Sequence, residues 1–224
     1  LHVRSRRQRQ MCIRDRAATL DGRVLTTAEA FGKHLFIAFE ASVPEPIIHV
    51  HLGLIGTFAL GWVGEVQGVV RLCISDGVQA AYLRGPQTCA AISPDRRDDI
   101  TGALGPDPIR PDADPERAFE RLHRSGRSIA ALLMDQRIAA GVGNIFRAEV
   151  LFRLGLPPTI AGRDIDALTW QGIWQELVVL MRAGVAAGRI DTVRPEHLPE
   201  VMGRAPRDDP HGGEVYVYRR AGQP

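Results

Sequence analysis

The sequence predicts an α+β protein in which an antiparallel β-sandwich or barrel precedes a helical domain. Residues 21–92 contain short segments rich in β-branched and aromatic residues, separated by glycine, proline or Asp76-Gly77. Four prolines then fall within residues 106–115, where neither a helix interior nor a sheet interior would accept them. Apolar residues beyond this point follow helical spacing. The 224 residues, 45% of them hydrophobic, are enough for two small cores.

Six strands are expected in the first half, at a spacing typical of antiparallel sandwiches and barrels. They are Gly22–Thr26, His34–Glu40, Ile47–Leu52, Gly56–Val63, Val69–Ser75 and Gln79–Leu83. The nineteen uncharged residues 46–64 are long enough for a membrane helix, but they contain four glycines and two histidines. Two strands joined at Gly53–Gly56 explain this stretch better, so we expect no membrane segment.

Four helices are expected in the second half. Asp114 and Pro115 predict a helix start, and Ser128 predicts the cap of a second helix that runs from Ile129 to Gln136. A glycine-rich turn precedes a third helix, Asn144 to Leu154, and the fourth spans about Asp166 to Ala187. Its expected buried residues are Leu168, Trp174, Leu177, Leu180 and Met181.

The basic character of the chain comes from its first sixteen residues. They hold six arginines and one aspartate, a local charge of +5, so a total of +2 leaves the other 208 residues at −3. The overall charge is therefore no argument for nucleic-acid binding. Residues 1–16 have no apolar periodicity, and we interpret them as a non-native leader, with a genuine disordered basic arm as the alternative.

The cysteines exclude two classes of protein. Cys12, Cys73 and Cys89 are odd in number and form no C-x-x-C pair, which argues against a disulfide scaffold or a complete thiolate zinc site. No apolar run at the N-terminus resembles a signal peptide. We therefore expect a protein of the reducing cytoplasm.

Two residue types occur once each, and both predict chemistry. Among 28 lysines and arginines only Lys33 is a lysine, and an amine can lose a proton whereas an arginine guanidinium cannot. The alternative is that a single lysine is present by chance and has no special role. Asn144 is the only asparagine, and Gly-Val-Gly-Asn at a helix start would present backbone N–H groups to an anion such as phosphate. An ordinary asparagine cap is the alternative.

Other polar and aromatic residues favour structural roles. His49 and His51 lie two apart on a predicted strand, with His34 nearby, but nothing in the sequence supplies an obvious further metal ligand, so we predict no metal site here. The three tryptophans are expected in the core, and three acidic residues are expected to cap, pair or solvate helices rather than to perform acid chemistry. These residues are Trp62, Trp170 and Trp174, and Asp135, Glu149 and Glu176.

Five motifs in one order resemble the formamidopyrimidine-DNA glycosylase and endonuclease VIII family, over about residues 18–224. Individually they are modest, and together they are specific, fitting the endonuclease VIII branch better. They are Gly32-Lys33-His34-Leu35, His49-Val50-His51-Leu52-Gly53-Leu54-Ile55-Gly56, Leu104-Gly105-Pro106-Asp107-Pro108, Leu132 to Gln136 continuing through Gly141 to Glu149, and the tail Tyr218 to Pro224.

The resemblance implies a two-domain enzyme that flips a damaged base out of double-stranded DNA and attacks C1′ with an N-terminal proline amine. An imine forms, and elimination then cuts the strand. The implied domains are a β-sandwich at 17–93, a linker at 94–111, a helix-two-turn-helix domain at 112–205 and the start of a zinc-finger hairpin at 206–224. We expect a monomer that acts on damaged DNA of the nucleoid in the cytoplasm.

Residue roles follow from the same resemblance. Lys33 matches a lysine that assists as a proton donor near the sugar and phosphate. Asn144, with Gly143 beside it, matches the asparagine that grips phosphate, and Leu54 matches the apolar wedge that fills the space left by the flipped base. Arg147 and Arg220 are further candidate phosphate contacts.

The chain also departs from the family. The Pro-Glu start is absent and residues 1–16 stand in its place, and the four zinc cysteines would follow Pro224, so zinc is expected only in a full-length protein. Gly53 and Ala103 replace DNA-contacting residues of some members. We therefore expect a catalytically incomplete chain. The alternatives are a non-catalytic helix-two-turn-helix nucleic-acid-binding protein and a metal-dependent enzyme built on His49 and His51.

Overall fold

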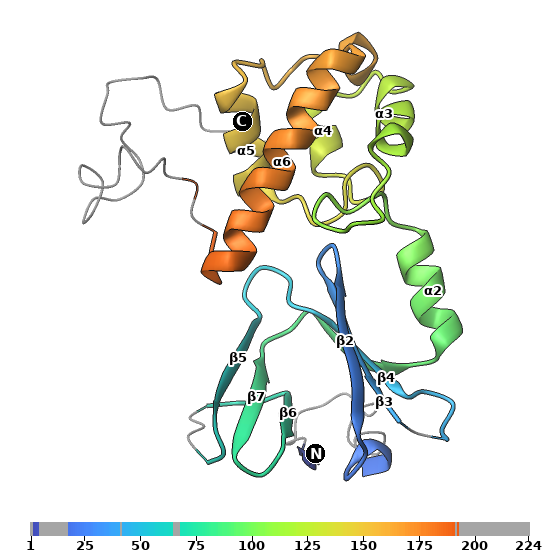
Figure 1. Cartoon of the computed structure of the whole chain (residues 1–224), viewed down its shortest axis with the longest axis vertical. Helices are drawn as coiled ribbons and strands as arrows, with labels where there is room; N and C mark the ends of the chain where they lie inside the picture. Colours follow the sequence, from blue (N-terminus) through green and yellow to red (C-terminus); the bar gives the residue numbers. More distant parts are fainter. Residues whose placement is uncertain (1, 5–17, 41, 65–67, 191, 193–224) are drawn as a thin grey trace, which may run out of the picture. The chain divides into compact units, whose positions relative to one another are not determined.

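The computed structural model describes residues 2–4, 18–40, 42–64, 68–190 and 192 (Figure 1). Its internal contacts divide the chain into two compact units, Leu1–Ala103 and Leu104–Pro224. The strands lie in the first unit, and most of the helical residues lie in the second. The expected succession of a β-domain and a helical domain is confirmed.

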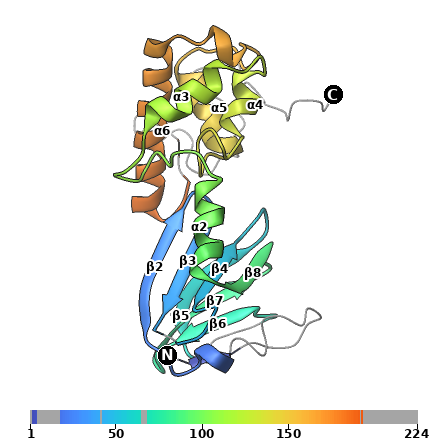
Figure 2. The same ribbon diagram turned by 90° about the vertical axis from the view of Figure 1, so that its right-hand side faces the viewer.

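Two four-stranded antiparallel sheets form the first unit (Figure 2). One has the order β1-β6-β7-β5, and the other has the order β2-β3-β4-β8. The strands of the first sheet are β1 (His2–Arg4), β6 (Leu72–Ser75), β7 (Gln79–Arg84) and β5 (Thr57–Trp62). Those of the second are β2 (Leu25–Phe31), β3 (His34–Phe39), β4 (Ile47–His51) and β8 (Thr88–Ile92).

One apolar core joins the two sheets and makes this unit a sandwich. Ile37, Ile48 and Val50 of the second sheet share a buried cluster with Leu72 and Leu83 of the first. Because side chains alternate along a strand, the neighbouring residues of β3 and β4 point to the other face. There Phe36, Ile47 and Ile92 form a second cluster, against which Ile100 of α2 (Pro94–Gly102) packs.

Five features of this unit differ from the sequence prediction. Strand β8 and helix α2 were not expected, because Thr-Cys-Ala-Ala-Ile is weakly strand-like and α2 is strongly polar and has no buried residue. Helix α2 occupies the first half of the expected linker. The first predicted strand begins later, at Leu25, and runs to Phe31. Residues 2–4, excluded with the leader, pair with β6, and Trp62, expected in the core, is 55% exposed.

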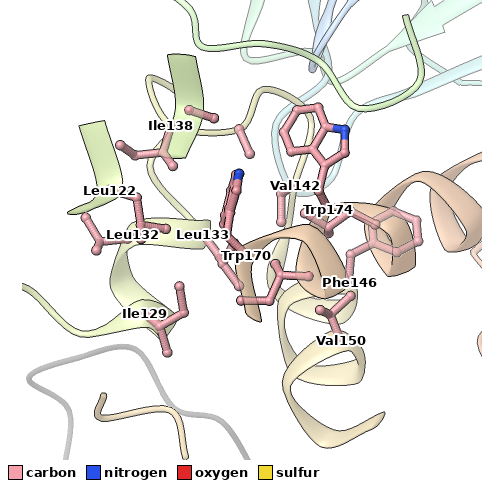
Figure 3. Close-up of a cluster of buried hydrophobic side chains, with 14 of the residues drawn as sticks. Leu122, Ile129, Leu132, Leu133, Ile138, Val142, Phe146, Val150, Trp170 and Trp174 are labelled. Carbon is pink, nitrogen blue, oxygen red and sulfur yellow. The ribbon is translucent and has the colours of Figure 1, made fainter. Parts of the chain in front are cut away.

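The second unit packs its helices around one apolar cluster (Figure 3). Trp170 lies in this cluster, and its indole Nε1 donates to the Pro115 carbonyl oxygen at 3.0 Å. Ile173 and Leu177 are buried on the same helix. The helices are α3 (Pro115–His123), α4 (Ile129–Leu133), α5 (Asn144–Arg153), the short 3-10 helix η1 (Gly162–Asp164) and α6 (Ala167–Ala187).

The two predicted caps of this unit, Asp114 and Ser128, are confirmed. Each accepts a hydrogen bond from a backbone N–H of the helix that follows, and Asp166, which was not predicted to be a cap, does the same for α6. Helix α4 ends at Leu133, three residues before the predicted end. The prediction that Leu168 lies on the buried side of α6 is wrong, because this residue is 78% exposed. Among the described residues, none of the helices has the length and apolar character needed to cross a membrane.

Candidate nucleic-acid interface

A glutamine side chain fixes the turn that leads into α5. Gln136 Nε2 donates to the carbonyl oxygens of Met134 at 3.1 Å and Val142 at 3.0 Å. Its Oε1 accepts from the Gly141 N–H at 3.0 Å. Gly141 has a φ of 88°, a conformation that favours glycine. The start of α5 is therefore held by three hydrogen bonds from one side chain, a role that the sequence analysis did not assign to Gln136.

The neighbouring carboxylate is a structural ion-pair centre. Asp135 Oδ2 lies 2.9 Å from Arg127 Nη1 and 2.9 Å from Arg137 Nη2. The hydrogen bonds from the Arg137 guanidinium, followed by those from Arg127 and the Arg137 backbone, hold the pKa of Asp135 far below its usual value. Asp135 is therefore ionised and paired, as the sequence predicts, and is not a proton donor.

The first residue of α5 is Asn144, and its cap is Gly143. Gly143 has extended backbone and contributes no side-chain hydrogen bond to the helix. The first turn also contains no acidic residue. Asn144 therefore lies one position past the cap, so the alternative of an ordinary asparagine cap is wrong. The backbone N–H groups of this turn lie at the positive end of the helix dipole without a capping side chain.

The Asn144 side chain contacts Arg147 within the same turn. An Nη2 hydrogen of Arg147 is donated to Asn144 Oδ1. Arg147 is only 2% exposed, which is unusual for an arginine. A direct contact between Arg147 and DNA phosphate, expected from the sequence, would require this guanidinium to leave its buried position. The structure thus brings Asn144 and Gly143 together with Arg147, whose buried side chain contacts the Asn144 carboxamide.

A second arginine of α5 is held differently. Arg153 Nε donates to Glu149 at 2.7 Å, its Nη1 lies 3.5 Å from Glu176, and its Nη2 donates to the Thr192 carbonyl at 2.7 Å. These contacts join α5 to α6. Glu149 and Glu176 therefore pair with an arginine, in agreement with the structural role expected for them.

In the first unit, Lys33 lies in the turn between β2 and β3. Gly32, which precedes it, has a φ of 57° and so allows the tight connection. The Lys33 side chain retains exposure to solvent. Partial burial nevertheless lowers its pKa from the ordinary lysine value. A lowered pKa brings the amine closer to the range in which it can exchange a proton.

Beside Lys33, three histidines and a phenylalanine form a stack on the outer face of the second sheet. His34 pairs with His51 and Phe36 with His49 in the β3–β4 register. The His34 ring centroid lies 5.1 Å from that of His49 and 4.9 Å from that of His51. Burial, with repulsion from neighbouring cations, lowers the pKa of all three, and that of His49 to about 4. The imidazoles are therefore neutral near pH 7.

The described residues do not fit a metal site. No three histidine, cysteine or acidic side chains among them are placed to hold one ion. Of the described cysteines, Cys89 is buried in the sandwich core, and burial raises its pKa to about 11. The expected zinc ligands are not among these residues, and zinc takes no part in the chemistry proposed for this chain.

The loop between β4 and β5 presents two apolar side chains to solvent. Leu54 is 96% exposed and Ile55 is 84% exposed. A Cβ at Gly56 would lie 2.3 Å from the Leu52 carbonyl oxygen, so the loop closes tightly only with glycine there. The sequence analysis identified Leu54, whereas Ile55, its exposed neighbour, was missed.

Lys33 and this loop lie at the same end of one sheet. Because His34 pairs with His51, the residues that precede β3 and those that follow β4 meet at one end of the sheet. Gln87, just before β8, joins them, since its N–H donates to the Leu52 carbonyl at 3.3 Å. Gln87 was not singled out from the sequence. Arg220 and the expected zinc-finger start at 206–224 lie outside the described residues.

Comparisons with known proteins identify relatives of the chain. Residues 104–194 match the family model described as the formamidopyrimidine-DNA glycosylase H2TH domain. The chain is 44% identical to "Endonuclease 8 1" of Mycobacterium tuberculosis over 219 residues, which cover 94% of this chain and 78% of that protein. It is 29% identical over 240 residues to the formamidopyrimidine-DNA glycosylase of Methylococcus capsulatus, covering 100% of this chain and 81% of that one.

Solved structures show the same fold. The Lactococcus lactis Fpg bound to DNA with an abasic site superposes with a TM-score of 0.71 at 19% identity, covering 86% of this chain and 73% of that chain. A similar match, with a TM-score of 0.70, is found for a mutant of that protein with DNA containing THF. Together with the identity to the mycobacterial protein over most of its length, these matches place the chain in the formamidopyrimidine-DNA glycosylase and endonuclease VIII family of DNA glycosylases.

Proposed function

We propose that the protein is a base-excision-repair enzyme that binds damaged double-stranded DNA and excises the damaged base. The kind of damage that we propose is an oxidised base. The observation that carries this proposal is the start of α5, where Gly143 leaves the helix N-terminus without a side-chain cap and Asn144 stands beside it. A helix end of this kind suits a phosphate group. The family membership supplies the reaction class.

The proposed reaction has two stages, base excision and strand cleavage. An amine attacks C1′ of the damaged nucleotide, the bond from C1′ to the base breaks, and the base leaves with a proton. The bond from C1′ to the ring oxygen O4′ then breaks, O4′ takes up a proton, and an imine forms between the amine nitrogen and C1′. This imine acidifies the C2′ hydrogen, and loss of that proton breaks the bond between C3′ and its oxygen, which leaves with the phosphate. Lys33 is proposed as a proton donor near the sugar, because its pKa is lowered toward the working range.

The remaining site residues bind and distort the duplex. Leu54 is proposed to enter the stack where the damaged base has been flipped out, an apolar role that suits its exposure at a loop tip. Gly143 and Asn144 are proposed to hold a backbone phosphate. Such a contact positions the enzyme without reading the base.

Borohydride reduction with abasic DNA tests the proposed imine directly. In a protein that carries the Pro-Glu start expected for the family, a trapped covalent adduct is expected. Its absence there would overturn the amine chemistry of this proposal.

Binding to short duplexes tests the phosphate site. Asn144→Ala should weaken binding to abasic and undamaged duplexes by the same factor, about tenfold for loss of one phosphate contact. Fluorescence anisotropy with labelled duplexes at several salt concentrations measures both constants. Selective loss for one duplex would contradict a phosphate role, whereas the salt dependence should be steep for both.

The second candidate function is a non-catalytic nucleic-acid binder that uses the helical unit alone. The open start of α5 is compatible with it. It leaves the placement of Lys33 and Leu54 at one end of the β-sandwich unexplained. If the Lys33→Ala and Leu54→Ala variants behaved as the unchanged chain on every DNA, this second function would be favoured.

A further inference from the structure

We infer that Arg147 is a positioning residue that sets which end of the Asn144 carboxamide faces a bound phosphate. This inference rests on the proposed role of Asn144. It starts from the hydrogen bond between an Arg147 Nη2 hydrogen and Asn144 Oδ1. A guanidinium carries only donors, so it can bind only the oxygen end of a carboxamide.

The consequence is an oriented amide. With Oδ1 engaged by Arg147, the Nδ2 end of Asn144, which has two N–H donors, is the end left to face away from the guanidinium. Phosphate oxygens accept hydrogen bonds and do not donate them at neutral pH. A carboxamide turned the other way would bring an oxygen toward the anion and repel it.

Burial makes this orientation durable. Arg147 is 2% exposed, and it lies on the third residue after Asn144, one helical turn along α5. Side chains three apart on a helix are neighbours, so the contact needs no movement of the backbone. A buried guanidinium has few other conformations, which restricts the carboxamide that it holds.

The charge of Arg147 adds to the effect. A cation in the first turn of a helix repels the positive end of the helix dipole, and acidic residues usually occupy this place. Helix α5 has no acidic residue in its first turn and instead buries Arg147 there. Such an arrangement favours an external anion at this end.

Two measurements separate positioning from a general structural role. Arg147→Met keeps an unbranched side chain of similar length and removes every donor. We expect it to weaken binding of an undamaged duplex about fivefold, less than a full phosphate contact. In the Asn144→Ala background the same substitution should cause no further loss, since no carboxamide remains to be oriented. An equal loss in both backgrounds would overturn the inference.

Nuclear magnetic resonance gives a readout that does not depend on DNA. Asn144 is the only asparagine, so labelling with ¹⁵N-asparagine yields one side-chain NH₂ pair. Arg147→Met should move this pair toward the shifts of an unstructured asparagine, and Arg147→Lys, which keeps a donor, should restore part of the difference. An unchanged pair in the methionine variant would overturn the inference.

Arg153→Met is the matched control. It also removes a partly buried arginine from α5, but one that binds Glu149 and Glu176 rather than Asn144. It should lower the midpoint of thermal unfolding and leave the Asn144 side-chain signals in place. If Asn144→Ala alone left DNA binding unchanged, the phosphate role would fail, while the orientation of the amide by Arg147 would still be decided by the NMR signals.

Discussion

His34 Nδ1 and His49 Nε2 lie 2.8 Å apart on neighbouring strands, so one imidazole donates a hydrogen bond to the other. This arrangement requires at least one of the two facing nitrogens to be unprotonated. His51 stacks on the same ring of His34. Lys33 lies next to His34 in sequence, and the cation of Arg96 also acts on His49. The cluster is therefore most stable while it remains uncharged.

The first prediction concerns acid. The pKa of His49 is lowered from 6.5 to about 4 in the folded state, so between these values the unfolded chain binds more protons. The contribution of His49 to the free energy of unfolding should therefore be constant above about pH 7 and fall as the pH drops from about 6.5 toward 4. The loss should be on the order of 2 kcal/mol from His49. Urea unfolding at a series of pH values measures it.

The control replaces His49 with the residue type beside it. His49→Phe keeps a flat ring next to Phe36, whose centroid lies 5.0 Å from that of His49, and removes the titrating group. The fall in stability between pH 6.5 and 4 should become shallower. A curve of unchanged slope would contradict the assignment.

The second prediction concerns a close backbone approach. A Cβ at Gly105 would lie 2.5 Å from the carbonyl oxygens of both Arg137 and Ile138. Backbone atoms cannot yield as a flexible side chain can, so Gly105→Ala should destabilise the helical unit by about 1–3 kcal/mol. Thermal or urea unfolding measures the change.

Gly172→Ala is the matched control in the same unit. Its Cβ would meet only Leu154 side-chain atoms at 3.9 Å, an ordinary contact. Because glycine is a poor helix former inside α6, this substitution should raise stability by up to about 1 kcal/mol. Equal destabilisation by both variants would refute the argument from crowding.

The third prediction separates Lys33 chemistry from binding. In a protein that carries the Pro-Glu start of the family, Lys33→Ala should slow strand cleavage more than it weakens DNA binding. Lys33→Arg keeps the charge but cannot give up a proton, so it should bind normally and still cleave slowly. Single-turnover cleavage and anisotropy measure the two effects. Equal losses in both would indicate that Lys33 only positions the DNA.

The fourth prediction concerns the loop tip. Leu54→Ala should leave thermal unfolding unchanged, because the side chain is almost fully exposed. Binding to a duplex with an abasic site should weaken about tenfold, through lost apolar contact with the unstacked bases. Leu60→Ala on β5, also exposed, is the control and should bind normally. A fluorescent base analogue beside the lesion would report whether the stack still opens.

The sequence predicted the elements that have strong local signals. Asp114 and Ser128 were predicted to be cap residues, and each caps a helix. The sequence also predicted correctly that His49 and His51 lie two apart on one strand, and therefore on the same face of it. These features depend on neighbours along the chain, which a sequence displays directly.

Features that depend on distant partners were missed or mistaken. The burial of Arg147 was missed, because it is set by packing around α5 that no local pattern reveals. Gln136 has its role because Gly141 and Val142 return to it through a turn. Trp62 was expected in the core from its residue type, whereas β5 leaves it exposed. In each case the neighbours in three dimensions determine the burial or the contacts of the residue, and its type alone does not.

The glycine cap of α5 has a cost for the free protein. A serine or aspartate at position 143 would satisfy a backbone donor and stabilise the helix by roughly a few tenths of a kcal/mol relative to glycine. Gly143 forgoes that gain, so a bound anion would complete the first turn of the helix. The protein should accordingly resist heat better when DNA occupies this end, and its most stable form should be the one engaged with its target.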